Sequence, residues 1–66
     1  MNIWQKYEGK KVFIRTSKER IYIGVIKEIA DVGDNIFFIS LTTRNGWATI
    51  VASEIVEIKE EKDYET

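Results

Sequence analysis

The 66-residue sequence contains no cysteine, no histidine and no proline. The absence of cysteine and histidine excludes disulfide bonds, the usual zinc and iron–sulfur ligand sets, and catalysis by a serine–histidine or cysteine–histidine pair. The chain also lacks the apolar run of about 18 residues that a membrane span needs, and its start lacks the apolar core of a signal peptide. We therefore expect a cytoplasmic protein that is not an enzyme, binds no metal or cofactor, and does not associate with membranes.

Size limits the chain to one small domain. A folded chain of this length buries about 60% of the surface that its unfolded form exposes, so it has room for a single core. No disulfide or structural metal compensates for that small core. Assembly with identical copies is therefore the expected source of additional buried surface.

Charge is balanced overall but uneven along the chain. The net charge is −1, which argues against a protein that coats DNA. Residues 1–20 hold six basic and two acidic groups, and residues 57–66 hold two basic and five acidic groups. The basic group is either a phosphate-tracking surface or a solvated face, and residues 59–66 are expected to form a frayed acidic tail.

Periodicity predicts a mainly β fold after a short helix. Asn2 and Gln5 have the spacing of a capping box, and the helix over 1–9 would end at Gly9. Alternating apolar residues then predict strands over 11–16, 21–30, 36–43, the segment after Gly46, and 55–58. Gly24 permits a bend or a close backbone approach. The prediction is a five-stranded, strongly bent antiparallel barrel over residues 10–58.

Two turns have clear sequence signals. In the segment 31–35, Gly33 and Asn35 are both suited to positive φ. Asn45-Gly46 is typical of a type I′ hairpin, whose register would place Arg44 opposite Trp47 and Leu41 opposite Ile50.

The strand over 36–43 is apolar on both faces. Such a strand is normally covered on both sides. Either the barrel closes over both sets of side chains, or a neighbouring copy covers the outer set.

The order of these elements resembles that of the Sm and Sm-like (LSm) family. The first Sm motif is matched by Lys11-Val12-Phe13-Ile14-Arg15, by Gly24-Val25-Ile26, and by Asp31 with Asn35-Ile36-Phe37-Phe38, although the glycine-to-Asn distance is one residue longer than usual. The resemblance implies a small bent barrel whose copies pair their fourth and fifth strands into a ring of six or seven. It also implies binding of single-stranded RNA.

The second Sm motif departs from the family pattern. Val51 occupies the position of its arginine, and Ala52 that of its glycine. In the family, that arginine joins residues corresponding to 31–35 in a uridine pocket. The resemblance therefore assigns RNA contacts to Asp31 and Asn35, with Gly33 where a base-stacking residue is common.

Arg44 and Trp47 form a second candidate RNA contact. A cation beside an indole can serve as a platform for unpaired bases, and it can equally be a cross-strand pair that stabilises the hairpin. Asp31 and Asn35 likewise fit turn chemistry without any ligand. The predicted function is RNA binding by a homo-oligomeric ring. The alternative is an SH3-like module that contacts proteins or is purely structural.

Overall fold

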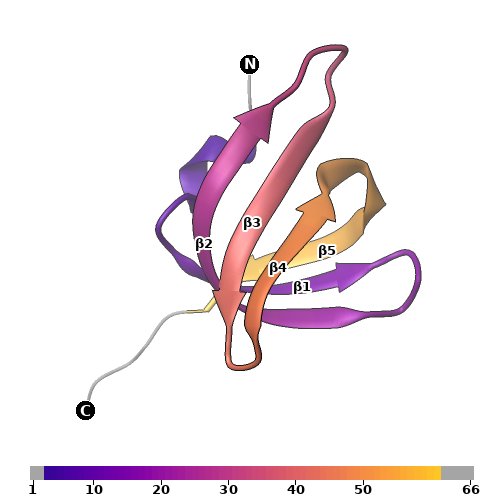
Figure 1. Ribbon diagram of the computed structural model, residues 1–66. Helices are drawn as coiled ribbons and strands as arrows, with labels where there is room; N and C mark the ends of the chain where they lie inside the picture. The colour runs from indigo at the N-terminus through magenta and orange to yellow at the C-terminus, as the bar shows by residue number, and fades with distance from the viewer. Residues whose placement is uncertain (1–2, 62–66) are drawn as a thin grey trace.

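The computed structural model describes residues 3–61 and folds them into one curved antiparallel sheet (Figure 1). The strands lie in the order β4-β3-β2-β1-β5. In chain order the elements are η1 (Gln5–Tyr7), β1 (Lys11–Thr16), β2 (Ile21–Asp31), β3 (Phe37–Thr43), β4 (Gly46–Val51), η2 (Ala52–Glu54) and β5 (Ile55–Glu60). The predicted mainly β class and the five antiparallel strands are confirmed.

The predicted strongly bent barrel is confirmed only in part, because the sheet is curved but does not close. Within residues 3–61, β4 pairs only with β3 and β5 pairs only with β1, so these two strands form its edges. The long strand β2 pairs with β1 along its first half and with β3 along its second half, and it curves between them (Figure 1). The sheet therefore curves over on itself, but its two edge strands, β4 and β5, do not pair with each other.

Two features of β2 accompany this curvature. A side chain at Gly24 would overlap the carbonyl oxygen of Thr42 and lie 2.9 Å from its carbonyl carbon. This confirms the expected close backbone approach at Gly24. Three residues further on, the register shifts between Ile26 and Glu28, so Lys27 forms a β-bulge, which increases the local twist.

The predicted helix over 1–9 is also wrong. The structure has a single 3₁₀ turn over Gln5–Tyr7, and the expected cap at Asn2 lies outside the described residues. Gly9 donates its N–H to the carbonyl of Ile26 at 2.8 Å, and its φ of 82° turns the chain. The chain therefore joins the sheet directly after this turn.

The core lies on the concave face of the sheet. The predicted inward face of β1 is confirmed, because Val12, Ile14 and Thr16 are all buried. Trp4 and Tyr7 pack against this core from the N-terminal turn. The remaining buried apolar side chains come from β2, β3, β4 and η2: Ile26, Ile39, Leu41, Ile50 and Ala52.

The outer face of β3 is only partly covered in a single chain. Phe38 is half-buried between its cross-strand partners Ala30 and Val51. Ile36, which was expected to begin the strand, lies just before it and is 43% exposed. Closure of the sheet over both apolar faces is therefore not observed.

The β3–β4 register differs from the prediction. Thr43 pairs with Gly46, Thr42 with Trp47 and Leu41 with Ala48, which displaces the pairing by two residues. Because the displacement is even, each side chain keeps its predicted face. Arg44 and Asn45 occupy the turn, and the positive φ falls on Gly46 at 116°.

The last strand is longer than predicted. It ends at Glu60, and Glu61 then donates its N–H to the carbonyl of Lys11 at 2.8 Å. The first residues of the predicted acidic tail therefore belong to β5, and residues 62–66 lie outside the described part. None of the helices in residues 3–61 is long and apolar enough to cross a membrane.

Candidate functional site

The connection from β2 to β3 is a turn held by its own polar groups. The Asp31 carboxylate accepts a hydrogen bond from the Gly33 N–H at 3.0 Å. Gly33 and Asn35 have φ values of 97° and 61°, which confirms the expected positive φ at both, and Asp34 adopts 55° as well. Backbone geometry therefore explains why Asp31 and Asn35 suit this turn. Both side chains are exposed, so their polar atoms can still form hydrogen bonds with a ligand.

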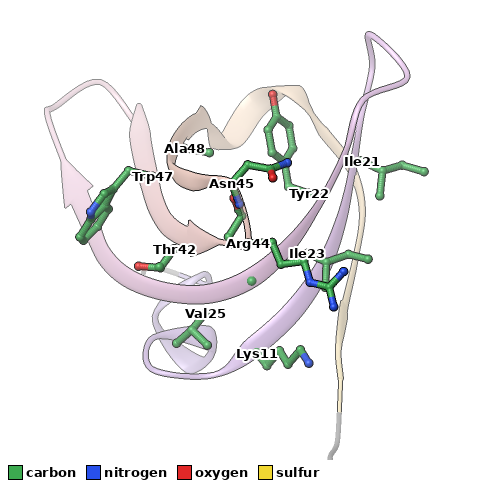
Figure 2. Close-up of a pocket in the computed structure, with 12 residues that line it drawn as sticks. Lys11, Ile21, Tyr22, Ile23, Val25, Thr42, Arg44, Asn45, Trp47 and Ala48 are labelled. Carbon is green, nitrogen blue, oxygen red and sulfur yellow. The ribbon is translucent and has the colours of Figure 1, made fainter.

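A hollow in the described surface lies at the other end of β3. It is a groove of about 810 Å³ between the first half of β2 and the β3–β4 hairpin (Figure 2). We call it the hairpin groove. Its lining includes one cross-strand row that runs from β1 to β4 on the outer face: Lys11, Val25, Thr42 and Trp47.

Apolar side chains dominate the exposed part of this groove. Trp47 is 70% exposed, although an indole is normally among the more buried side chains. Ile21 and Ile23, on the same face of β2 as Val25, are 57% and 45% exposed. An apolar surface grouped in this way marks an interaction site more often than scattered apolar residues do.

The expected cross-strand pair of Arg44 and Trp47 is wrong. The observed register places Thr42 opposite Trp47, and Arg44 lies in the turn itself. The Arg44 side chain extends toward Ile23, while Trp47 lies on the other side of the groove (Figure 2). Both residues nevertheless line the same groove, so the structure brings together the two residues of the second candidate site.

Hydrogen bonds of the Thr43 hydroxyl explain why the β3–β4 turn falls at Arg44 and Asn45. This hydroxyl accepts a hydrogen bond from the Asn45 N–H at 3.1 Å and donates one to the Gly46 carbonyl at 2.8 Å. These bonds stabilise Arg44 and Asn45 as the central residues of the turn. The sequence signal of Asn45-Gly46 was correct about the hairpin but misplaced the turn by one residue.

The electrostatic character of the groove is basic. Among the described residues, the charged side chains that line it are Lys11 and Arg44. Beyond it on the outer face, Arg15 and Glu57 form an ion pair of 3.2 Å between Nε and Oε1. Two hydrogen bonds, the one from Arg15 having the larger effect and the one from Lys59 the smaller, lower the pKa of Glu57 below its ordinary value.

The wider basic group of residues 1–20 is partly neutralised by β5 and the turn before it. The Nζ atom of Lys10 lies 3.7 Å from Oε2 of Glu60, and Nζ of Lys18 lies 3.8 Å from Oε2 of Glu54. Together with the Arg15–Glu57 pair, these contacts make a continuous phosphate-tracking face less favourable than the sequence alone indicated.

The two sequence-predicted sites do not meet within one chain. The Asp31–Asn35 turn and the β3–β4 turn lie at opposite ends of β3 (Figure 1). Seven extended residues span about 20 Å. Lys11, which belongs to the basic group of residues 1–20, joins the second site. Ile21, Ile23 and Val25 join it too and were missed, although their spacing of two residues could have placed them on one face.

Comparisons with protein-family models, curated proteins and solved structures gave no significant match to this chain. Residues 3–61 bring together no group of three or more aspartate, glutamate, cysteine or histidine side chains that could hold a metal ion.

Proposed function

We propose that this protein is a non-catalytic, Sm-like cytoplasmic protein that binds single-stranded RNA and works as a homo-oligomeric ring. The observation that carries the RNA proposal is the 70% exposed Trp47 in a groove whose charged lining is basic. An exposed indole offers a stacking surface to an unpaired base, worth about 1–3 kcal/mol per base. Lys11 and Arg44 supply positive charge for neighbouring phosphates.

The groove favours a single strand over a duplex. Base-paired RNA stacks its bases inside the helix and presents phosphates and sugars, whereas an unpaired strand exposes the faces of its bases. The apolar residues of the groove, Val25, Ile23 and Trp47, suit those faces. Its two cations are few for duplex binding, which depends on many phosphate contacts.

The open edges of the sheet support the assembly part of the proposal. Strand β4 carries no charged residue over Gly46–Val51, and an unpaired, uncharged edge is a ready template for another strand. Strand β5 carries Glu57, Lys59 and Glu60, and both glutamates already form ion pairs within the chain, with Arg15 and with Lys10. Basic residues flank β4 at both ends, with Arg44 on one side and Arg20 in a hollow of about 280 Å³ on the other. The proposed pairing of β4 with β5 of a neighbour therefore rests on the two unpaired edges of the sheet.

Tryptophan fluorescence provides the test of RNA binding. In a Trp4→Phe variant, Trp47 is the remaining indole, and a titration with oligouridine at low salt is expected to quench its emission. Asn35→Ala serves as the matched comparison, because it changes the other candidate site at the opposite end of β3. In the variants, binding is followed by the fluorescence anisotropy of labelled oligouridine, because Trp47→Leu removes the indole reporter. Loss of binding in Trp47→Leu but not in Asn35→Ala supports the groove, while the reverse result favours the turn.

Light scattering coupled to gel filtration tests the assembly. The proposal expects a mass of six or seven times the 7.7 kDa of one chain. A monomer over a wide concentration range contradicts the ring.

The exposed apolar pair Ile21 and Ile23 favours a second candidate function, an SH3-like protein-interaction module. Aliphatic side chains of this exposure suit a protein partner as well as a base. This module is expected to leave the fluorescence of Trp47 unchanged by any oligonucleotide, which separates it from the first proposal.

A further inference from the structure

We propose that the hairpin groove accepts single-stranded RNA and single-stranded DNA equally, so that its ligand class is an unpaired strand of either sugar. The inference rests on the proposed function, because it concerns the same groove. It follows from the kinds of polar group that a strand would meet there.

A strand that lies over the groove crosses the row from Lys11 to Trp47. The row includes three strand-to-strand spacings, or about 14 Å. At the stacked spacing of about 3.4 Å per nucleotide, this length accommodates about four nucleotides. The cations at Lys11 and Arg44 provide for two phosphates.

Telling RNA from DNA requires a polar group that contacts the 2′-hydroxyl. The middle of the row offers little for this purpose. Val25 is apolar, and the hydroxyl oxygen of Thr42 is buried, with no hydrogen-bond partner in the structure. A ligand therefore meets the carbon atoms of both residues.

Of the other polar side chains of the groove, Lys11 and Arg44 are assigned to phosphates and Trp47 to a base, while Thr43, Tyr22 and Asn45 are engaged or turned away. The hydroxyl of Thr43 makes the two hydrogen bonds that hold the hairpin turn. Tyr22 belongs to the opposite face of β2 from Val25, and Asn45 extends toward Tyr22 and away from Val25 (Figure 2). Once Lys11 and Arg44 contact phosphates and Trp47 stacks on a base, Val25 and Thr42 in the middle of the row provide no group that reads the sugar.

Two phosphate contacts also define the salt dependence. For single strands, the logarithm of the binding constant falls with the logarithm of salt by about 0.7 per phosphate, so two contacts give a slope of about −1.4. Affinity is then expected to fall about sevenfold between 50 and 200 mM salt.

The test compares two probes that differ only in the sugar, octamers of uridine and of deoxyuridine, each titrated into the Trp4→Phe variant. The inference expects equal dissociation constants within about fivefold. A larger preference for the RNA probe overturns it and leaves the proposed RNA function intact. Absence of quenching by both probes refutes RNA binding in the hairpin groove, on which the proposed function rests.

The salt slope gives an independent measurement. Arg44→Gln and Lys11→Gln are each expected to reduce the slope by about 0.7, while Lys27→Gln, at the bulge outside the groove, leaves it unchanged. A slope unaffected by the groove variants would overturn the assignment of these two phosphate contacts.

Discussion

Replacing Gly24 with alanine is expected to destabilise the fold more than any other glycine-to-alanine change in the described residues. The added Cβ would overlap the carbonyl oxygen of Thr42 and lie 3.2 Å from the Cα of Thr43. Both of these atoms belong to the backbone and cannot rotate away. The overlap can therefore be relieved only if β2 and β3 separate where Gly24 pairs with Thr43. The change therefore acts on the strand pairing that supports the hairpin groove.

The magnitude follows from two costs. Overpacking costs about 1–3 kcal/mol, and weakening two ladder hydrogen bonds costs about 1 kcal/mol each. The smaller conformational freedom of alanine in the unfolded chain offsets about 0.5–1 kcal/mol, which leaves a loss of about 3 kcal/mol. A chain of 66 residues has a total stability of about 3–10 kcal/mol, so Gly24→Ala removes a large part of it.

Urea unfolding followed by circular dichroism, at one fixed protein concentration, measures this loss. Gly33→Ala is the matched control: its φ is 97°, and an added Cβ meets nothing within 4 Å. The control is expected to cost about 1 kcal/mol through backbone strain alone. Equal midpoints for Gly24→Ala and Gly33→Ala would refute the argument that steric overlap decides the effect.

Three further predictions address other parts of the molecule. Thr42→Val removes a buried hydroxyl without a partner and is expected to raise the free energy of unfolding by about 1 kcal/mol, whereas a lower urea midpoint would contradict this. Leu41→Ala is expected to cost about 2–5 kcal/mol, because Leu41 is fully buried, while Ile21→Ala, at 57% exposure, stays within about 0.5 kcal/mol; similar losses would contradict the assigned faces. The pKa of Glu57 is lower in the folded chain than in the unfolded chain, so its contribution to stability is present above the ordinary glutamate range and is lost as the pH falls through the lowered value. Carboxyl NMR titration should show that pKa rising toward its ordinary value in Arg15→Gln, and an unchanged pKa would contradict the role of Arg15.

The sequence predicted the strands well because their signals are local. Alternation placed Val12 and Ile14 on the buried face of β1, and the structure confirms both. The β3–β4 register depends on a finer detail, the two hydrogen bonds of the Thr43 hydroxyl, which move the turn to Arg44 and Asn45. The preference of Asn-Gly for the centre of a turn does not take into account such hydrogen bonds from a neighbouring side chain.

The groove and the open edges required information from the whole chain. Both faces of β2 are apolar around Gly24, so alternation alone cannot tell whether Tyr22 or Ile23 points to the core. The pairing of β2 with β1 and β3 decides this, and it leaves Ile21 and Ile23 exposed beside Trp47. Closure of the barrel could not be predicted for a similar reason, because strand periodicity does not determine whether the two edges of a sheet meet.

Amide NMR on the ¹⁵N-labelled protein, with and without oligouridine, tests the central claim most directly. Binding in the hairpin groove predicts the largest shifts at the Trp47 indole N–H and at the backbone amides of Val25 and Thr42, with smaller changes at the Asp31–Asn35 turn. Shifts confined to the Asp31–Asn35 turn, or a spectrum unchanged by saturating RNA, would contradict the account.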